Sequence, residues 1–156
     1  MADQHLLRDE LGDFSSIVCF RACVIGVEEA LGKRAAMVAL RAAGRKRGKD
    51  LVASLGLTDS APDDLAHALD TALGPDGTKL CRVDKIERLG ESHFKVFLRE
   101  TVCSAGEPQG SDRELSFTFG ALHGAVEALY GLRLRGKQVG SVLRGQDHDI
   151  VELWER

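Results

Sequence analysis

The sequence lacks the features that would place it in a membrane or nucleic-acid-binding class. Its most apolar run, IVCFRACVIGV at residues 17–27, is shorter than the roughly 20 residues that span a bilayer, and it contains Arg21. The start, MADQHLLRDELGDF, is polar and acidic, so we expect no secretory leader. The formal net charge is -3, which argues against a chain that wraps nucleic acid electrostatically.

Cysteine, repeats and low-complexity segments are also scarce. The four cysteines, Cys19, Cys23, Cys81 and Cys103, form no dense disulfide framework, which favours free thiols in a reducing cytoplasm. The 156 residues show no domain boundary and are enough to bury one core. We therefore predict a single cytoplasmic domain over 1–156, with a flexible or loosely packed N-terminus over 1–13.

The first half of the chain has helical patterns. We predict a helix over about 14–31, with N-cap residues before it and Gly32 after it, and a second within KRAAMVALRAAGRKRGKDLVASLG from its apolar spacing. A short third helix is expected within APDDLAHALDTALG, with Pro62 and two aspartates at its start and Gly74 after its end. Within the second helix, Gly44 and Gly48 lie in the middle of an apolar stripe with 3 and 4 spacing. Each costs about 1 kcal/mol relative to alanine in a helix. A close crossing with another helix would compensate for this cost.

Alternating patterns appear later in the chain. The segments KLCRVDKIER and HFKVFLRETVC flank the turn-like LGES and predict a hairpin. Two more strands are expected in LRLRGKQVGSVLRG and HDIVELWE, joined by GQD, with a bulge near Gly136 where the alternation changes phase. Helices, hairpin, helix and hairpin in this order predict an α+β fold with an antiparallel sheet of about four strands.

The segment SFTFGALHGAVEALYG, residues 116–131, predicts a helix that is apolar on two sides. Large residues form one arc of the helical wheel, and glycine and alanine form the opposite one. One side can pack on the sheet, while the bare side either receives another helix or leaves room for a ligand. His123 lies at the edge of the large arc. We expect it to bond Glu127 or a backbone carbonyl; contact with a ligand or with haem is the alternative.

Three other groups of polar residues also allow two interpretations. Cys19 and Cys23 share a helix face and could form half of a zinc site, but we favour two buried small side chains. For Asp147, His148 and Asp149 we favour a solvated turn over a metal or proton-transfer site, because neighbouring strand residues point to opposite faces. For the run RKRGK at 45–49 we favour a solvated helix face over an anion or nucleic-acid patch. No hydrolase, phosphate-loop, zinc-protease or dinucleotide motif is found, so an enzyme is not favoured.

The segments LRAAGRKRGKDL, LCRVDKIERLGESHFKVFLRETV and TFGALHGAVEALYG, with the final hairpin, resemble the vinyl-4-reductase domain, whose members are often called hydrocarbon-binding proteins. That family is related in fold to trafficking subunits of the TRAPP complex and to haem nitric-oxide sensors. The resemblance covers about 33–154. It implies helices packed on one face of a twisted antiparallel sheet, an apolar cavity between them, and dimerisation through the helical layer. Many members carry cysteines in the last hairpin; here Ser141 and Asp149 stand there, so no metal site is expected. An acylated or redox-active Cys81 or Cys103 is an alternative by the same analogy.

The leading hypothesis is a cytoplasmic homodimer that is not an enzyme and holds an apolar small molecule, such as a lipid, hydrocarbon or tetrapyrrole-like compound, between helices and sheet. A haem or tetrapyrrole cofactor is less favoured than another apolar ligand, and neither a membrane span nor a nucleic-acid partner is expected. The alternatives are a protein-interaction adaptor with a fully packed core, in which Gly44 and Gly48 serve dimer packing, and a haem sensor that uses His123. The predicted lining comprises Phe20, Val24, Phe94, Val96, Leu98, Phe119, Leu122, His123 and Val126.

Overall fold

The computed structural model describes residues 8, 10–11 and 16–156. The predicted N-terminal segment 1–13 therefore lies mostly outside the described residues. In the described part, no helix combines the length and the apolar character needed to cross a membrane.

The secondary structure has the predicted α+β order. The helices are α1 (Ile17–Leu31), α2 (Lys33–Leu55), α3 (Pro62–Leu73) and α4 (Phe117–Tyr130); the strands are β1 (Arg82–Gly90), β2 (His93–Arg99), β3 (Leu134–Gly140) and β4 (Asp149–Glu155). Local sequence explains several boundaries. Pro62 opens α3, where its missing N–H costs nothing, and Gly131 closes α4 in the left-handed conformation with φ 63°.

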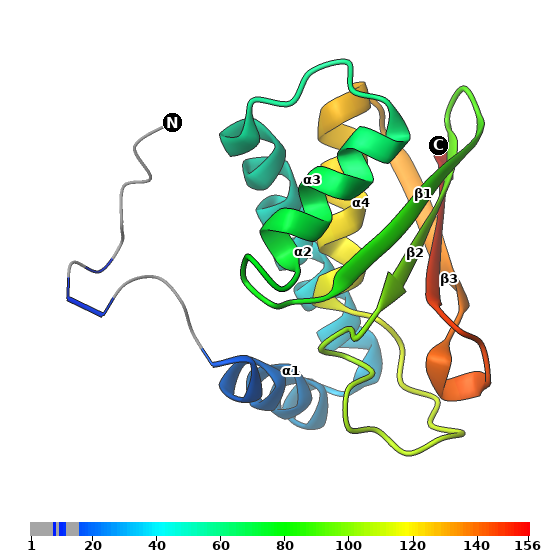
Figure 1. Cartoon of the computed structure of the whole chain (residues 1–156). Coiled ribbons are helices and arrows are strands. Elements are labelled where there is room, and N and C mark those ends of the chain that lie inside the picture. The colour runs from blue at the N-terminus through cyan, green and yellow to red at the C-terminus, as the bar shows by residue number, and fades with distance from the viewer. Residues whose placement is uncertain (1–7, 9, 12–15) are drawn as a thin grey trace.

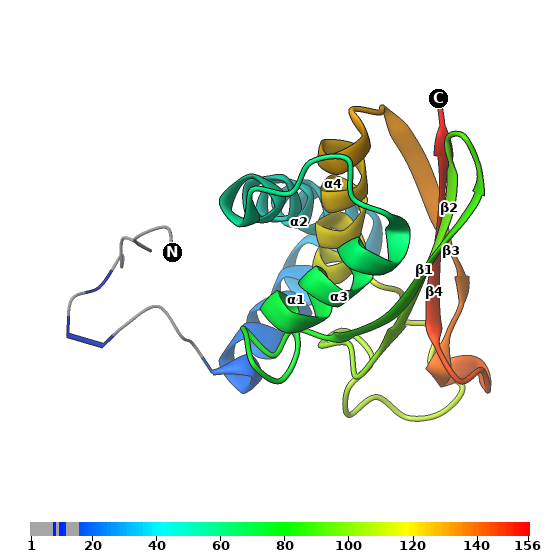
Figure 2. The ribbon, with the colours of Figure 1, turned by 45° about the horizontal axis from the view of Figure 1, so that its top comes forward.

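The four strands form one antiparallel sheet in the order β1-β2-β4-β3. Figure 2 shows the sheet nearly edge-on, with the helices gathered on one side of it. This arrangement confirms the predicted fold class. The last hairpin connection is longer than the predicted GQD turn, because a short 3-10 helix, η1 (Val142–Arg144), lies between β3 and β4.

The predicted bulge near Gly136 is misplaced. The register of β3 against β4 shifts between Gln138 and Gly140 instead. Gly136 keeps regular pairing with Leu153, and a Cβ there would lie 2.5 Å from the Leu153 side chain and 3.2 Å from the ring of Phe119. Glycine at 136 therefore leaves space for the side chains of Leu153 and Phe119. The regular pairing of β3 with β4 is interrupted only near Gly140, where the chain turns toward η1.

Helices α2 and α4 cross in direct backbone contact, and Figure 2 shows them next to each other on the same side of the sheet. A Cβ on Gly44 or Gly48 would lie well under 3.0 Å from backbone atoms of α4, and a Cβ on Gly120 or Gly124 would meet the backbone of α2 in the same way. The predicted close crossing is confirmed, and the bare face of α4 receives a helix of the same chain. The alternative that the glycines of α2 serve dimer packing is wrong.

The opposite face of α4 packs on the sheet. Its large side chains join those of α3 and of the inward-facing strand residues in one buried cluster. The three polar residues that interrupt the apolar pattern of α4, Ser116, Thr118 and Glu127, are buried as well. Helix α1 differs, because Val24 is its only buried residue. This helix lies at the margin of the helix layer (blue in Figure 1).

Candidate functional site

The predicted lining residues lie in and beside the core. Phe94, Val96, Leu98, Leu122 and Val126 have no exposed surface, and Phe119 and Val24 are buried too. Phe20 on α1 packs edge-on against Phe117 at 5.0 Å between ring centroids. The side chains from β2 and α4 fill the space between helix and sheet, and the cavities described below are lined by other residues. Their contact with a ligand stays a prediction.

His123 makes the contacts expected of a structural histidine. Its Nε2 lies 2.9 Å from the carbonyl oxygen of Leu134, which can only accept a hydrogen bond, so Nε2 carries the proton. The same atom lies 3.3 Å from a carboxylate oxygen of Glu127. Burial lowers the pKa of His123, against the opposing effect of Glu127, so the ring is neutral near pH 7. The expected bond to Glu127 or a carbonyl is confirmed.

An open groove of about 920 Å³ runs between α1 and the chain that follows β2. One wall is a face of α1, with Ile17, Ala22 and Ile25; the other is the segment 100–106, with Val102 and Ala105. Small-molecule pockets usually measure about 300–1,000 Å³ and are mostly apolar, with a few polar groups. The groove meets this description in size and lining.

Charged side chains at the groove balance one another. The lining includes Arg21 and Lys79, which are basic, and Glu29 and Glu100, which are acidic. A charged ligand would find no excess of the opposite sign to compensate for its desolvation. The groove therefore suits an uncharged molecule.

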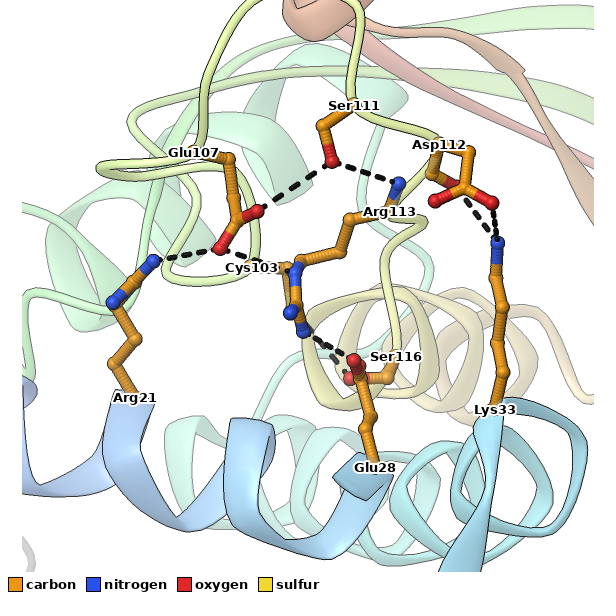
Figure 3. A network of polar contacts seen from close by, with 9 residues as sticks. All are labelled: Arg21, Glu28, Lys33, Cys103, Glu107, Ser111, Asp112, Arg113 and Ser116. Atoms are coloured by element: carbon orange, nitrogen blue, oxygen red, sulfur yellow. Dashed lines mark hydrogen bonds and ion pairs between the residues drawn. The ribbon is translucent and has the colours of Figure 1, made fainter.

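The wall made by α1 is held by ion pairs rather than by a large apolar contact (Figure 3). Arg21 donates to Glu107 at 2.8 Å, and Arg113 pairs with both Glu28 and Glu107. At the far end of α1, Lys33 bonds the carboxylate and the carbonyl of Asp112. All these bonds join the first two helices to the loop between β2 and α4. The polar network thus sets the width of the groove.

The opposite wall is anchored by Asp149, the first residue of β4. Its carboxylate is fully buried and accepts hydrogen bonds from the hydroxyls of Thr101 and Ser104, both at 2.8 Å, and from the backbone N–H of Val142 at 3.0 Å. The interpretation of residues 147–149 as a solvated turn is wrong for Asp149. Sequence alone could not show this, because the two hydroxyl partners lie more than forty positions away.

The cysteines also differ from expectation. Cys19 and Cys23 are exposed on α1, so their interpretation as buried small side chains is wrong. Cys81 and Cys103 are buried, and burial raises the pKa of the Cys81 thiol to about 12. Among the described residues, no three His, Cys, Asp or Glu side chains gather in a way that could hold a metal ion.

The predicted lining does not include the groove residues Ile17, Ile25, Val102 and Ala105. The first helix has more apolar residues than one buried face can hold. This excess is a signal in the sequence that Ile17 and Ile25 could line an exposed apolar surface. Val102 falls in the segment HFKVFLRETVC, which predicts a strand as far as Cys103, whereas β2 ends at Arg99 and the residues after it form a wall of the groove.

Comparison with known proteins finds similar solved structures but no matching family. No protein-family model matches the sequence, and no curated protein matches it either. Among solved structures, the chain is similar to the phenol-responsive sensory domain of the transcription activator PoxR, solved with phenol. The TM-score is 0.66 at 15% identity, with 92% of this chain and 76% of that chain covered.

The chain is also similar to a subunit 3 of the trafficking protein particle complex from Naegleria fowleri, covalently bound to palmitic acid. Here the TM-score is 0.52 at 10% identity, with 90% of this chain and 97% of that chain covered. At such identities the likeness establishes the fold alone. The predicted relation in fold to trafficking subunits is confirmed.

Proposed function

We propose that this chain is a cytoplasmic binding domain, not an enzyme, that holds an uncharged apolar small molecule in the groove between α1 and residues 100–106. The observation that carries the proposal is the groove itself, with apolar walls, balanced charges and a volume of about 920 Å³. The two similar structures support it, since one is a phenol-responsive domain and the other is bound to palmitic acid. Membership of the vinyl-4-reductase family stays a prediction.

The predicted lining residues enter this proposal as the inner boundary of the site. Phe20 and Val24 lie on the same helix as the groove wall but on its inner face, where Phe20 meets Phe117. If a ligand moved α1 outward, the contact between Phe20 and Phe117 would be replaced by contact of these rings with the apolar surface of the ligand. The core residues of β2 and α4 would then be the next layer that the ligand reaches.

The experiment is a titration with N-phenyl-1-naphthylamine, an uncharged apolar dye whose fluorescence rises in apolar sites. Gly26 lines the groove, and a side chain added there meets nothing within 4 Å, so Gly26→Phe should fill the groove without disturbing the fold. Ala30→Phe, at an exposed position of α1 that does not line the groove, is the matched control.

We expect saturable binding to the natural chain and to Ala30→Phe, and at least tenfold weaker binding to Gly26→Phe. Equal binding to all three proteins would place the ligand elsewhere. Absence of binding to the natural chain, together with no co-purified ligand in native mass spectrometry, would reject the proposal.

We also propose that the domain acts as a homodimer through its helical layer. Two exposed apolar residues of the helical layer, Leu31 at the end of α1 and Val38 of α2, line one open hollow at the junction of these helices, and Val38 is 69% exposed. Exposed apolar side chains of this size are typical of contact surfaces when they gather in a patch.

Analytical ultracentrifugation should give a dimer for the natural chain and a monomer for Val38→Glu. A natural chain that is monomeric at high concentration would contradict the proposed dimer.

The adaptor alternative is supported by one observation, the complete packing of α4 against the sheet by the predicted lining residues. It predicts a dimer that binds no dye. The haem-sensor alternative has no comparable support, because Nε2 of His123 already donates to Leu134. Appearance of a Soret band that is lost in His123→Ala would revive it.

A further inference from the structure

A second cavity, on another side of α2, is lined mainly by basic residues. Its volume is about 550 Å³, and it is formed by the middle of α2, the turn after α4 and the end of β4. The basic lining residues are Arg45, Lys46, Lys49, Arg133 and Arg156; the acidic ones are Asp50 and Glu127. Five cationic side chains thus face two carboxylates in a chain whose formal net charge is -3.

Three segments distant in sequence bring these charges together. The left-handed residue Gly131 ends α4 and turns the chain so that Leu132 and Arg133 face α2. The backbone N–H of Arg156 donates to the carbonyl of Arg133 at 3.2 Å, which places the end of β4 against the same turn. The cluster is a product of the fold, since only Arg45, Lys46 and Lys49 are neighbours in the sequence.

A buried carboxylate fixes one edge of the cavity. The Glu127 side chain is 2% exposed and accepts two hydrogen bonds from Arg45, at 2.8 and 2.6 Å, and one from the backbone N–H of Leu134 at 2.8 Å. Lys49 Nζ lies 3.4 Å from Oε2 of Glu127. Burial acts to raise the pKa of Glu127, but the bonds from Leu134 and Arg45 outweigh it and the pKa is lowered. The carboxylate stays charged and holds the Arg45 guanidinium in a fixed orientation.

The remaining cations have little internal compensation. Lys46 pairs with the exposed Asp50, and among the described residues the side chains of Arg133 and Arg156 have no hydrogen-bond or ion-pair partner. Like charges gathered at one cavity repel one another and focus a positive potential in it. A bound anion would remove this repulsion, whereas the balanced groove under α1 offers no such gain.

We propose that this cavity is an anion site for a small phosphate-bearing molecule, separate from the apolar groove. Guanidinium groups, here those of Arg45, Arg133 and Arg156, match the geometry of phosphate oxygens and can bond them in pairs. The volume lies in the range of small-molecule pockets. The sequence interpretation of RKRGK as a solvated helix face does not account for the convergence of Arg133 and Arg156 on it.

The test measures pyrophosphate binding to the whole chain by isothermal titration calorimetry, with ionic strength held constant by sodium chloride. The double variant Arg133→Gln with Arg156→Gln removes two cations whose side chains support no internal bond, so the fold should be kept. Lys95→Gln, on the outer face of the sheet, removes a charge that does not line the cavity and is the control.

We expect one binding site in the natural chain and in Lys95→Gln, with at least tenfold weaker affinity in the double variant. Circular dichroism and thermal unfolding should be the same for all three proteins. Equal affinity in the double variant, or no pyrophosphate binding by the natural chain, would overturn the proposal. Because dye binding to the groove is measured separately, either site can fail without the other.

Discussion

The carbonyl oxygen of Ala121 in α4 occupies the position that a Cβ atom on Gly48 of α2 would need. Gly44, Gly120 and Gly124 have the same relationship with the backbone of the facing helix. The two helices therefore touch backbone to backbone, and a side chain at any of these four positions would force them apart. This contact, rather than a ligand, is the reason for the bare face of α4.

The first prediction concerns this crossing. Gly48→Ala should lower the free energy of unfolding by about 2 kcal/mol or more, because the added methyl group meets backbone rather than a flexible side chain. Gly26→Ala is the control: its Cβ meets nothing within 4 Å, and alanine in a helix should add roughly 0.5–1 kcal/mol. Urea denaturation measures both. A Gly48→Ala protein as stable as the natural chain would contradict the crossing.

The second prediction concerns His123 and pH. Its pKa is lowered in the fold, so the unfolded chain takes up a proton at a higher pH than the folded chain does. The stability linked to this group is present above its ordinary value near 6.5 and is lost as the pH falls below it.

We expect the free energy of unfolding to fall between pH 7 and pH 5 in the natural chain and to fall less in His123→Gln. The exposed His67→Gln is the matched control and should behave as the natural chain does. Urea denaturation at pH 7, 6 and 5 measures the difference. The same slope in all three proteins would show that His123 is not the group responsible.

The third prediction concerns the anchor of the loop between β2 and α4. Asp149→Asn replaces one acceptor oxygen with a donor and leaves at least one buried hydroxyl or N–H unpaired. The expected cost is about 3 kcal/mol. Hydrogen exchange should rise at residues 101–105 in particular. Asp147→Asn, at the exposed neighbouring position, should change stability by no more than about 0.5 kcal/mol; an equal effect of both changes would reject the anchoring role.

The fourth prediction concerns the thiols. Cys19 and Cys23 are exposed and should react at once with a disulfide reagent such as 5,5′-dithiobis(2-nitrobenzoic acid) at pH 8. Cys81 and Cys103 are buried, and the raised pKa of Cys81 leaves almost no thiolate, so these two should react only on unfolding. Two thiols before and four after addition of denaturant is the expected count. Fast reaction of a third thiol would show that the core opens near Cys81 or Cys103.

Much of the fold follows from the sequence by itself. Periodicity indicates α2, α3 and α4, and Pro62 and the glycines that follow the three helices mark their ends, because these signals act within a few neighbouring residues. Alternation determines the two hairpins, and glycines in the stripe of α2 indicate a close helix crossing. The two apolar faces of α4 follow from the order of its residues on a helical wheel.

Only the tertiary structure decided what each surface meets. The partners of Asp149, the burial of Glu127 against Arg45 and the exposure of Cys19 and Cys23 depend on contacts between distant segments. The groove beside α1 also depends on such contacts, since ion pairs from Arg21 and Glu28 to the loop between β2 and α4 supplement the small apolar contact of that helix. Local propensity determines the helices and strands. Burial and charge compensation depend instead on which side chains the fold brings opposite each other, and no short stretch of sequence encodes these contacts.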